Sequence, residues 1–308
     1  MNILITGCNG FVGRHAVALF RQRGHDVFGS DIQAATSLPI PYRMLDIRDQ
    51  QAVERLLGGI RPDGILHLGG VAFVPMALEN PQWVFHVNTI GPLNLLSAMK
   101  AEAPNARLLF VTSAEVYGSQ AAARPLAEDA PYRPDNLYGV TKAAADHAAL
   151  LFAERNHLPL LVARPSNHIG VGQSREFVTS AFAAQLAAIS RGAEVVMRVG
   201  NLRQQRDFTD VRDVVRAYAL LLEEGAPGRA YNIASGKPVA IQSVLDMLCD
   251  ISGVHPRMET DPDLYRPTDQ RPTYDTSRIR ADVGWAPLIP LRDSLAELYA
   301  DIHSHPGE

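Results

Sequence analysis

The stretch TGCNGFVG, residues 6–13, decides the fold. It follows the apolar run NILIT and leads into a helical pattern, so its three glycines stand where a strand turns into a helix. The first glycine permits the tight turn, the second lets the backbone approach a pyrophosphate, and the third lets helix and strand pack closely. Free amides and the positive dipole end of the helix would face the phosphates. An ordinary glycine-rich turn is the alternative, but the context favours a dinucleotide site. The predicted cofactor contacts of this loop are Gly7, Gly10, Phe11, Val12 and Gly13.

Short apolar runs alternate with longer helical patterns on the carboxyl side of this loop. Strict alternation implies parallel strands with right-handed crossovers. We therefore predict an α/β fold, a Rossmann-type doubly wound parallel sheet in residues 1–164. After residue 164 the loops become rich in Pro, Gly and Arg, so residues 165–308 are predicted to form mainly a smaller C-terminal substrate-binding lobe, with a segment near 205–225 returning to the first. The expected strands are 2–6, 25–30, 42–45, 64–68, 107–113 and 158–164, and the expected helices are 11–23, 49–58, 82–102, 138–156, 177–191 and 241–251.

Two acids follow expected strands near the glycine loop. Asp31 comes 18 residues after Gly13 and could accept hydrogen bonds from the adenosine ribose. A carboxylate there would repel a 2′-phosphate, which favours NAD(H) slightly over NADP(H), although the nearby Arg14 weakens this inference. Asp46 could meet the adenine, or it could equally cap the helix that starts near Asp49.

The chemistry is predicted from two stretches, VTSAEVYG at 111–118 and YGVTK at 138–142. Tyr138 and Lys142 stand four residues apart, so they share one face of a helix. A nearby ammonium would lower the pKa of the phenol, so that Tyr138 could exchange a proton with a substrate oxygen while a cofactor handles hydride. Ser113 lies at a strand end, where open parallel sheets bind ligands, and could hydrogen-bond that oxygen. Taken alone, the Tyr138–Lys142 pair is more simply explained as a partly exposed pair of side chains on a surface helix.

Composition excludes several classes of function. The 308 residues carry a net charge of −4, which does not suggest a nucleic-acid partner. The sequence contains no run of 18 apolar residues, so it predicts no membrane span. The amino-terminal residues do not resemble a signal peptide. Cys8 and Cys249 match no metal or disulfide spacing. We expect a cytoplasmic protein without a metal site.

At motif level the chain resembles the extended short-chain dehydrogenase/reductases that act on nucleotide sugars. The resemblance rests on TGCNGFVG, HLGG, VNTIG, VTSAEVYG, YGVTK, ARPSNHIG and RDFTDVRDVV, and runs from residue 2 to about 294. RPSNHIGVGQ, EFVTSAFAAQLAAI and YNIASGK are most like the GDP-4-keto-6-deoxy-mannose reductases, with GDP-mannose 4,6-dehydratases nearly as similar. The resemblance implies NAD(P)H-dependent reduction of a GDP-linked 4-keto-6-deoxy-hexose to GDP-rhamnose or its C4 epimer. It also implies a homodimer joined by a four-helix interface from residues 82–102 and 138–156.

The same resemblance assigns residues to the site. Asn88 matches an asparagine that supports the active-site helix, and the arginines of the later loops match groups that hold a diphosphate. The implied catalytic residues are Ser113, Tyr138, Lys142 and, as an acid whose part is left open, Glu115. The implied cofactor contacts include Ile47, Leu68, Gly69, Tyr138 and Lys142 beside Asp31 and Asp46. The implied substrate contacts are Asn88, Asn167, Phe177, Val178, Arg206 and Arg266. Arg198 is added because guanidinium groups in the later loops suit an anionic nucleoside diphosphate.

Two alternatives stay open at this point. A dehydratase or epimerase would use the same Ser/Tyr/Lys set, and a dehydratase needs an extra acid/base, for which Glu115 is the candidate. Ala114 stands where dehydratases of the glucose type carry an aspartate, which argues against that type. A non-catalytic dinucleotide sensor would be expected to lose Tyr138 or Lys142, and both are present.

Overall fold

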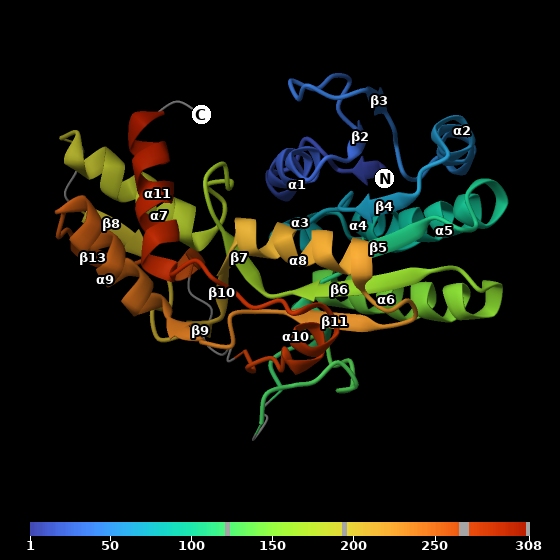
Figure 1. Cartoon of the computed structure of the whole chain (residues 1–308). Coiled ribbons are helices and arrows are strands. Elements are labelled where there is room, and N and C mark those ends of the chain that lie inside the picture. Colours follow the sequence, from blue (N-terminus) through green and yellow to red (C-terminus); the bar gives the residue numbers. More distant parts are fainter. Residues whose placement is uncertain (121–123, 193–195, 265–270, 306–308) are drawn as a thin grey trace.

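The computed structural model describes residues 1–120, 124–192, 196–264 and 271–305. Its centre is a parallel sheet (Figure 1) of β1 (Asn2–Thr6), β2 (Asp26–Asp31), β3 (Tyr42–Met44), β4 (Gly64–His67), β5 (Arg107–Val111), β6 (Leu160–Pro165) and β11 (Ala230–Ile233). The order across this seven-stranded sheet is β3-β2-β1-β4-β5-β6-β11, so the direction of strand addition reverses between β1 and β4. Ligands of such sheets bind at the carboxyl ends of the strands near this reversal.

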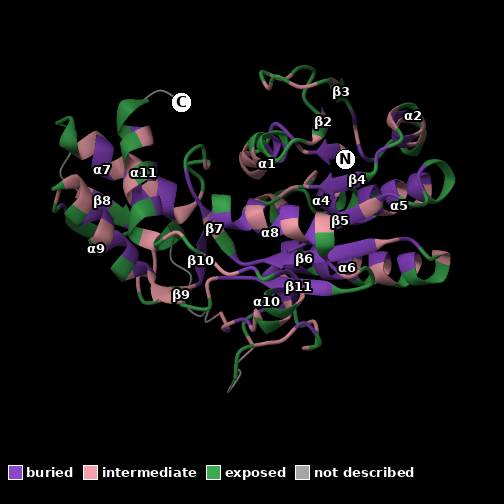
Figure 2. Cartoon of the chain, viewed as in Figure 1, coloured by how far each residue is buried: buried purple, intermediate pink, exposed green. Residues whose placement is uncertain are grey.

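Helices cover both faces of the sheet. On one face lie α1 (Phe11–Gln22) and α8 (Val211–Glu224), and on the other lie α2 (Gln50–Ile60), α5 (Gly91–Glu102) and α6 (Leu137–Asn156). Side chains alternate along β1, so Ile3 and Ile5 join the core under α1 and α8 while Leu4 joins the core under α5. Burial on both faces explains why the strands are continuous apolar runs, and Figure 2 shows the sheet as the most buried part of the view.

One long helical run carries a π-helical segment. It is made of α4 (Pro81–Phe85), the π-helix η1 (His86–Ile90) and α5, and the short α3 (Val74–Glu79) precedes it. The sequence predicts a single helix over 82–102, and the π segment within it is the difference. Single π turns of this kind occur often at functional sites. Here the segment contains Asn88, one of the expected site residues.

The C-terminal part has its own core and small sheets. The core lies among α7 (Val178–Ser190), α9 (Ile241–Ser252) and α11 (Leu291–Ser304). The small sheets pair β7 (Asn167–Ile169) with β10 (Phe208–Asp210), β8 (Val196–Val199) with β13 (Arg257–Thr260), and β9 (Gln205–Arg206) with β12 (Val239–Ala240). The remaining helices are α10 (Ser277–Val283) and the 3-10 turns η2 (Ala114–Tyr117) and η3 (Pro262–Leu264).

Two segments after residue 165 belong to the large sheet. Strand β11 pairs with β6, and α8 packs on β4, β5 and β6. The sequence does not predict β11, because its four residues are too short to show a period. The division at residue 164, with a returning segment near 205–225, stays a prediction. No helix among the described residues is long and apolar enough to cross a membrane.

Candidate active site

The glycine loop forms a cradle at the end of β1. Gly7 has φ +72°, and a Cβ added to it would lie 2.7 Å from the Gly69 amide nitrogen. A Cβ on Gly13 would lie 2.3 Å from the Gly7 carbonyl oxygen. No side chain caps α1 at Gly10, so the amides of its first turn face outward for an anion. These features fit the pyrophosphate of a bound dinucleotide.

An acid and a cation border this loop. The Asp31 carboxylate accepts hydrogen bonds from the amides of Asn9, at 3.2 Å, and Gln33, at 3.3 Å. The Nε of Arg14 donates to the Asn9 carbonyl at 2.9 Å. Both charges therefore sit beside the place where an adenosine ribose would lie.

The two readings of Asp46 are separated by its partners. Asp49 caps α2 by accepting from the Ala52 amide at 3.0 Å, so Asp46 is not the cap. Asp46 instead forms an ion pair with Arg48 at 2.6 Å, which lowers the pKa of its carboxyl. Its neighbour Ile47 packs under the start of α5, close to Gly91. Adenine contact by these two residues stays a prediction.

Three of the expected catalytic residues meet at the carboxyl end of β5. Ser113 caps η2, and its hydroxyl lies near the phenol of Tyr138 on α6. Lys142, one turn further along α6, donates from Nζ to the Val111 carbonyl at 3.2 Å. All three side chains are buried, at less than one tenth exposed. The helical spacing and the strand end therefore bring the hydroxyl, phenol and ammonium to one place.

The pKa of Tyr138 differs from the sequence expectation. Burial raises it well above its ordinary value, a nearby Glu115 raises it further, and the Ser113 hydrogen bond acts the other way. The expected lowering by Lys142 is wrong for this structure, because Nζ lies 6.0 Å from the phenol ring centre and points at Val111. Burial also lowers the pKa of Lys142 to about 8. The phenol is therefore protonated at neutral pH and suited to donate a proton.

Asn88 ties the π segment to the active-site helix. Its Nδ2 donates to the Thr141 hydroxyl at 3.1 Å and to the Val71 carbonyl at 3.0 Å, and its Oδ1 accepts from the Val71 amide at 2.8 Å. The Thr141 hydroxyl in turn donates to the Tyr138 carbonyl at 2.8 Å. These bonds match the support role that the resemblance implies. Substrate contact by Asn88 stays a prediction.

Glu115 is held from two sides. Its Oε2 accepts from the Asn136 amide group at 2.8 Å and pairs with Arg271 at 3.0 Å. Asn136 also caps α6 by accepting from the Gly139 amide at 2.8 Å. Arg271 reaches Asp135 as well, at 3.1 Å. Sequence reasoning missed Asn136, although an asparagine just before a helical pattern is a capping signal.

The expected substrate contacts on the C-terminal side start at β7. Asn167 donates from Nδ2 to the Asp207 carbonyl at 3.3 Å. Phe177 caps α7, and its ring meets that of Phe73 edge-on at 6.4 Å, a partner that sequence reasoning missed. Val178 is the first residue of α7. The substrate roles of these residues are predictions.

The expected arginines are not gathered in one cluster. Arg206 lies on β9 near Tyr274, whose pKa is raised by burial and by Glu115 against the opposing effects of Arg271 and Arg206. Arg198 lies on β8, is 72% exposed, and stands 3.9 Å from Asp261. Arg266 lies outside the described residues. Arg271 pairs with Glu115, and Arg206 lies near Tyr274.

A buried aspartate organises the loops around Asn167. The Asp207 carboxylate accepts from the amides of Ser235 and Gly236, both at 2.7 Å. It also accepts from the Ser166 hydroxyl at 3.2 Å. It therefore joins three loops on the substrate side.

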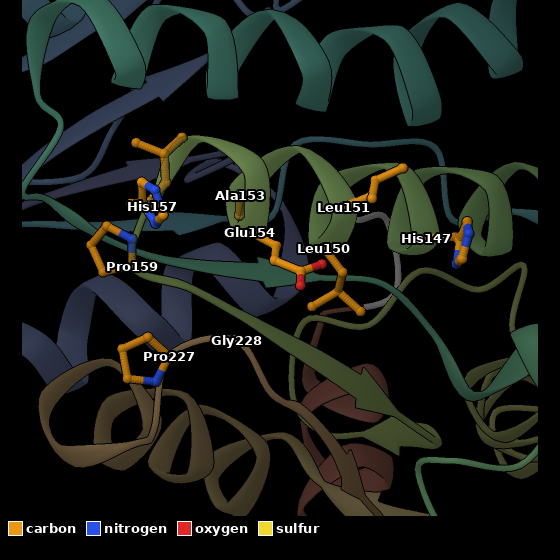
Figure 3. Close-up of a pocket in the computed structure, with 10 residues that line it drawn as sticks. His147, Leu150, Leu151, Ala153, Glu154, His157, Pro159, Pro227 and Gly228 are labelled. Carbon is orange, nitrogen blue, oxygen red and sulfur yellow. The ribbon is translucent and has the colours of Figure 1, made fainter.

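A hollow on the molecular surface lies away from these groups (Figure 3). It runs along the outer side of α6 and is lined by His147, Leu150, Leu151, Ala153, Glu154, His157, Leu158, Pro159, Pro227 and Gly228. It contains no expected site residue and is not part of the candidate active site. Within the described ranges, no group of three or more His, Cys, Asp or Glu side chains is arranged to hold a metal ion.

The glycine cradle at the strand reversal and the Ser/Tyr/Lys set beside it define an extended short-chain dehydrogenase/reductase. The family model for GDP-mannose 4,6 dehydratase matches residues 4–298. The chain belongs to this family of nucleotide-sugar-modifying enzymes.

Several known proteins are similar along the whole chain. GDP-6-deoxy-D-mannose reductase of Pseudomonas aeruginosa is 35% identical over 99% of this chain and 98% of its own. The structure of RMD from Pseudomonas aeruginosa complexed with NADPH has a TM-score of 0.84 at 33% identity, covering 98% of this chain and 99% of that one. UDP-glucose 4-epimerase of Thermus thermophilus, complexed with NAD, has a TM-score of 0.88 at 27% identity, covering 99% and 100%. These relatives support a dinucleotide cofactor of either kind.

Proposed function

We propose that the chain uses NAD(P)H to reduce the C4 keto group of a GDP-linked 4-keto-6-deoxy-hexose, converting GDP-4-keto-6-deoxy-mannose to GDP-rhamnose. The observation that carries the proposal is the placement of Ser113 beside Tyr138, next to a Glu115 carboxylate already engaged by Arg271 and Asn136. The 35% identical relative named GDP-6-deoxy-D-mannose reductase supports it. So does GDP-6-deoxy-D-talose 4-dehydrogenase of Aggregatibacter actinomycetemcomitans, 29% identical over 82% of this chain and 80% of its own.

The side chains divide the reaction between them. The dinucleotide, when bound on the glycine cradle, supplies the hydride that C4 receives. Tyr138 donates the proton to the C4 oxygen, and the Ser113 hydroxyl orients that oxygen. Lys142 is an ammonium below about pH 8 and is assigned to cofactor binding, while solvent reprotonates the phenolate that remains.

Glu115 separates reduction from dehydration. A dehydratase needs a carboxylate that can remove a C5 proton and release water from C6. Here Oε2 is bound by a guanidinium at 3.0 Å and an amide at 2.8 Å, and both contacts hold the carboxylate in place and occupy the oxygen that would have to take a proton from C5. Ala114 precedes it in place of a second acid. These contacts favour the reductase over the dehydratase and leave the epimerase to the assay.

The substrate and cofactor preferences follow from charge. One guanidinium group can donate two parallel hydrogen bonds to phosphate oxygens, so we assign Arg206, Arg198 and Arg266 to the diphosphate. Asn88, Asn167, Phe177 and Val178 complete the proposed substrate contacts. Asp31 favours NAD(H) slightly, while Arg14 on the same loop leaves room for NADP(H).

A homodimer through α5 and α6 is part of the proposal. Large apolar side chains stay more than a third exposed on α4, η1 and α6, namely Phe85, Ile90, Leu137, Val140 and Leu151. The opposite side of α6 is buried against the sheet by alanines, so this helix carries apolar side chains on two sides. A second copy of the chain would cover the exposed side. Light scattering of the purified protein would show twice the mass of the 33.6 kDa chain, and a monomer would exclude this contact.

The reaction is tested by cofactor stoichiometry. Purified protein is incubated with GDP-4-keto-6-deoxy-mannose and NADH or NADPH, and absorbance at the reduced-nicotinamide band is followed. We expect one reduced cofactor consumed per sugar. Turnover of GDP-mannose without net cofactor loss would replace the reductase by a dehydratase, and reversible C4 epimerisation without loss would replace it by an epimerase.

A further inference from the structure

The buried ion pair between Asp146 and Arg164 lies next to the Ser113, Tyr138 and Lys142 set and has no part in the proposed reaction. Asp146 on α6 is 0% exposed and Arg164 at the end of β6 is 2% exposed. The guanidinium grips the carboxylate with two bonds, Nε to Oδ2 at 2.8 Å and Nη2 to Oδ1 at 3.0 Å. A buried pair of this kind adds little stability over apolar residues of the same volume. Stability alone therefore does not account for it.

The Asp146 carboxylate also holds the end of β5. It accepts from the Thr112 hydroxyl at 2.9 Å on one side and from the Tyr132 hydroxyl at 2.9 Å on the other. Thr112 stands between Val111, whose carbonyl accepts from Lys142, and Ser113, which lies beside Tyr138. The hydrogen bond from Thr112 to Asp146 thus joins α6 to the residue that stands between Val111 and Ser113.

The charge of Asp146 also faces Lys142. Tyr138, Lys142 and Asp146 follow one another at four-residue spacing, so they lie on one face of α6. The other titratable group near Lys142 is His67 on β4, and burial lowers the pKa of this imidazole to about 3, so it is neutral. Asp146 favours the ammonium of Lys142, and Arg164 lies on the far side of the carboxylate as its counter-ion.

We propose that Asp146, clamped by Arg164, is a positioning residue that fixes Ser113 against Tyr138 through Thr112 and keeps Lys142 charged. The proposal rests on the proposed catalytic set. It makes Thr112 and Arg164 functional partners, although neither touches substrate.

The positional part is tested at Thr112. Thr112→Val keeps the shape and removes the hydroxyl, so kcat should fall on the order of 10- to 100-fold while KM stays within about twofold. Thr112→Ser keeps the hydroxyl and should restore most of kcat. Tyr132→Phe is the control, because it deletes the Tyr132 bonds to the same carboxylate and to Arg164 Nη2 but keeps the Thr112 bond and both Arg164–Asp146 bonds, so kcat should stay near the wild-type value. Equal kcat losses for Thr112→Val and Tyr132→Phe, or none for either, would overturn the proposal.

The electrostatic part has a readout that needs no substrate. The chain has three lysines, Lys100, Lys142 and Lys237, so lysine labelled with 13C at Cε gives three signals for pH titration by NMR. Lys100→Arg and Lys237→Arg assign them. In the wild-type protein the Lys142 midpoint should lie at about 8, and in Asp146→Asn it should fall by about one pH unit. Thr112→Val keeps the Asp146 carboxylate, so the Lys142 midpoint should stay at its wild-type value. This comparison can be made even if Asp146→Asn does not fold. An unchanged midpoint in folded Asp146→Asn, or a midpoint that moves in Thr112→Val, would contradict the proposal.

The two proposals fail separately. If the wild-type protein consumes no cofactor with any keto sugar, the proposed reaction is wrong, and the lysine titration still decides the part of Asp146. If the wild-type protein is active and Thr112→Val loses no more kcat than the control Tyr132→Phe does, only the positioning proposal is wrong.

Discussion

Replacing Lys142 by methionine should make the free protein more stable at pH 7 while removing its activity. Lys142 is 7% exposed, and burial lowers its pKa from 10.5 to about 8. This difference of about 2.5 pH units corresponds to a penalty of about 3 kcal/mol for keeping the ammonium inside. Methionine has a similar length and no charge, but it leaves the Val111 carbonyl unpaired, at about 1–2 kcal/mol. The expected net gain in unfolding free energy is about 1–2 kcal/mol.

The pH dependence gives this prediction its sign. Below pH 8 both folded and unfolded chains carry a protonated Lys142, so the full penalty is present. Between 8 and 10.5 the unfolded chain binds more protons, so the wild-type protein gains stability with rising pH and the penalty disappears above 10.5. The methionine variant lacks this change. The gap between the two proteins should therefore move by about 2 kcal/mol in favour of wild type from pH 7 to about pH 9.5.

Urea unfolding of both proteins at the two pH values measures the gap. Lys100→Met is the control, because Lys100 is exposed on α5 and its variant should differ from wild type equally at both pH values. A Lys142→Met protein less stable than wild type by several kcal/mol at pH 7, or a gap that does not change with pH, would refute the reasoning.

Three further predictions concern the acid, the cradle and the cofactor. Tyr138→Phe should keep the fold and lower turnover about 10²- to 10⁴-fold in the absorbance assay, and full activity would remove Tyr138 as the acid. Gly13→Ala places a Cβ 2.3 Å from a carbonyl oxygen and should lower Tm and abolish dinucleotide binding by calorimetry, whereas Gly59→Ala, with nothing within 4 Å, should change neither. Equal effects of the two alanines would contradict the cradle. Asp31→Ala should raise kcat/KM for NADPH relative to NADH, and an unchanged ratio would show that Asp31 does not read the ribose.

Local signals predicted most of the fold. The glycine loop, the alternation of strands and helices and the four-residue spacing of Tyr138 and Lys142 each involve neighbours in sequence. Their structural consequences, a Rossmann-type sheet and one helix face, follow from backbone geometry. The π segment around Asn88 changes only the local winding of an expected helix.

The rest depends on contacts between distant residues. Arg271 reaches Glu115 across more than 150 positions, and no pattern in either stretch indicates that pairing. The Thr112–Asp146–Arg164 network joins a strand end, a helix and another strand. Whether the pKa of Tyr138 is raised or lowered depends on how deeply the phenol is buried and on how far the Lys142 ammonium lies from it. Both follow from the folded structure and not from the local sequence.

Deuteride transfer tests the proposed reaction most directly. The protein is incubated with GDP-4-keto-6-deoxy-mannose and NADH or NADPH deuterated at the nicotinamide C4, and the sugar is examined by mass spectrometry and NMR. We predict one deuterium in each product molecule, at C4 of the hexose, and about 10²- to 10⁴-fold slower formation of this labelled product by Tyr138→Phe. A product without deuterium, or conversion of GDP-mannose with no transfer from added cofactor, would contradict the reductase.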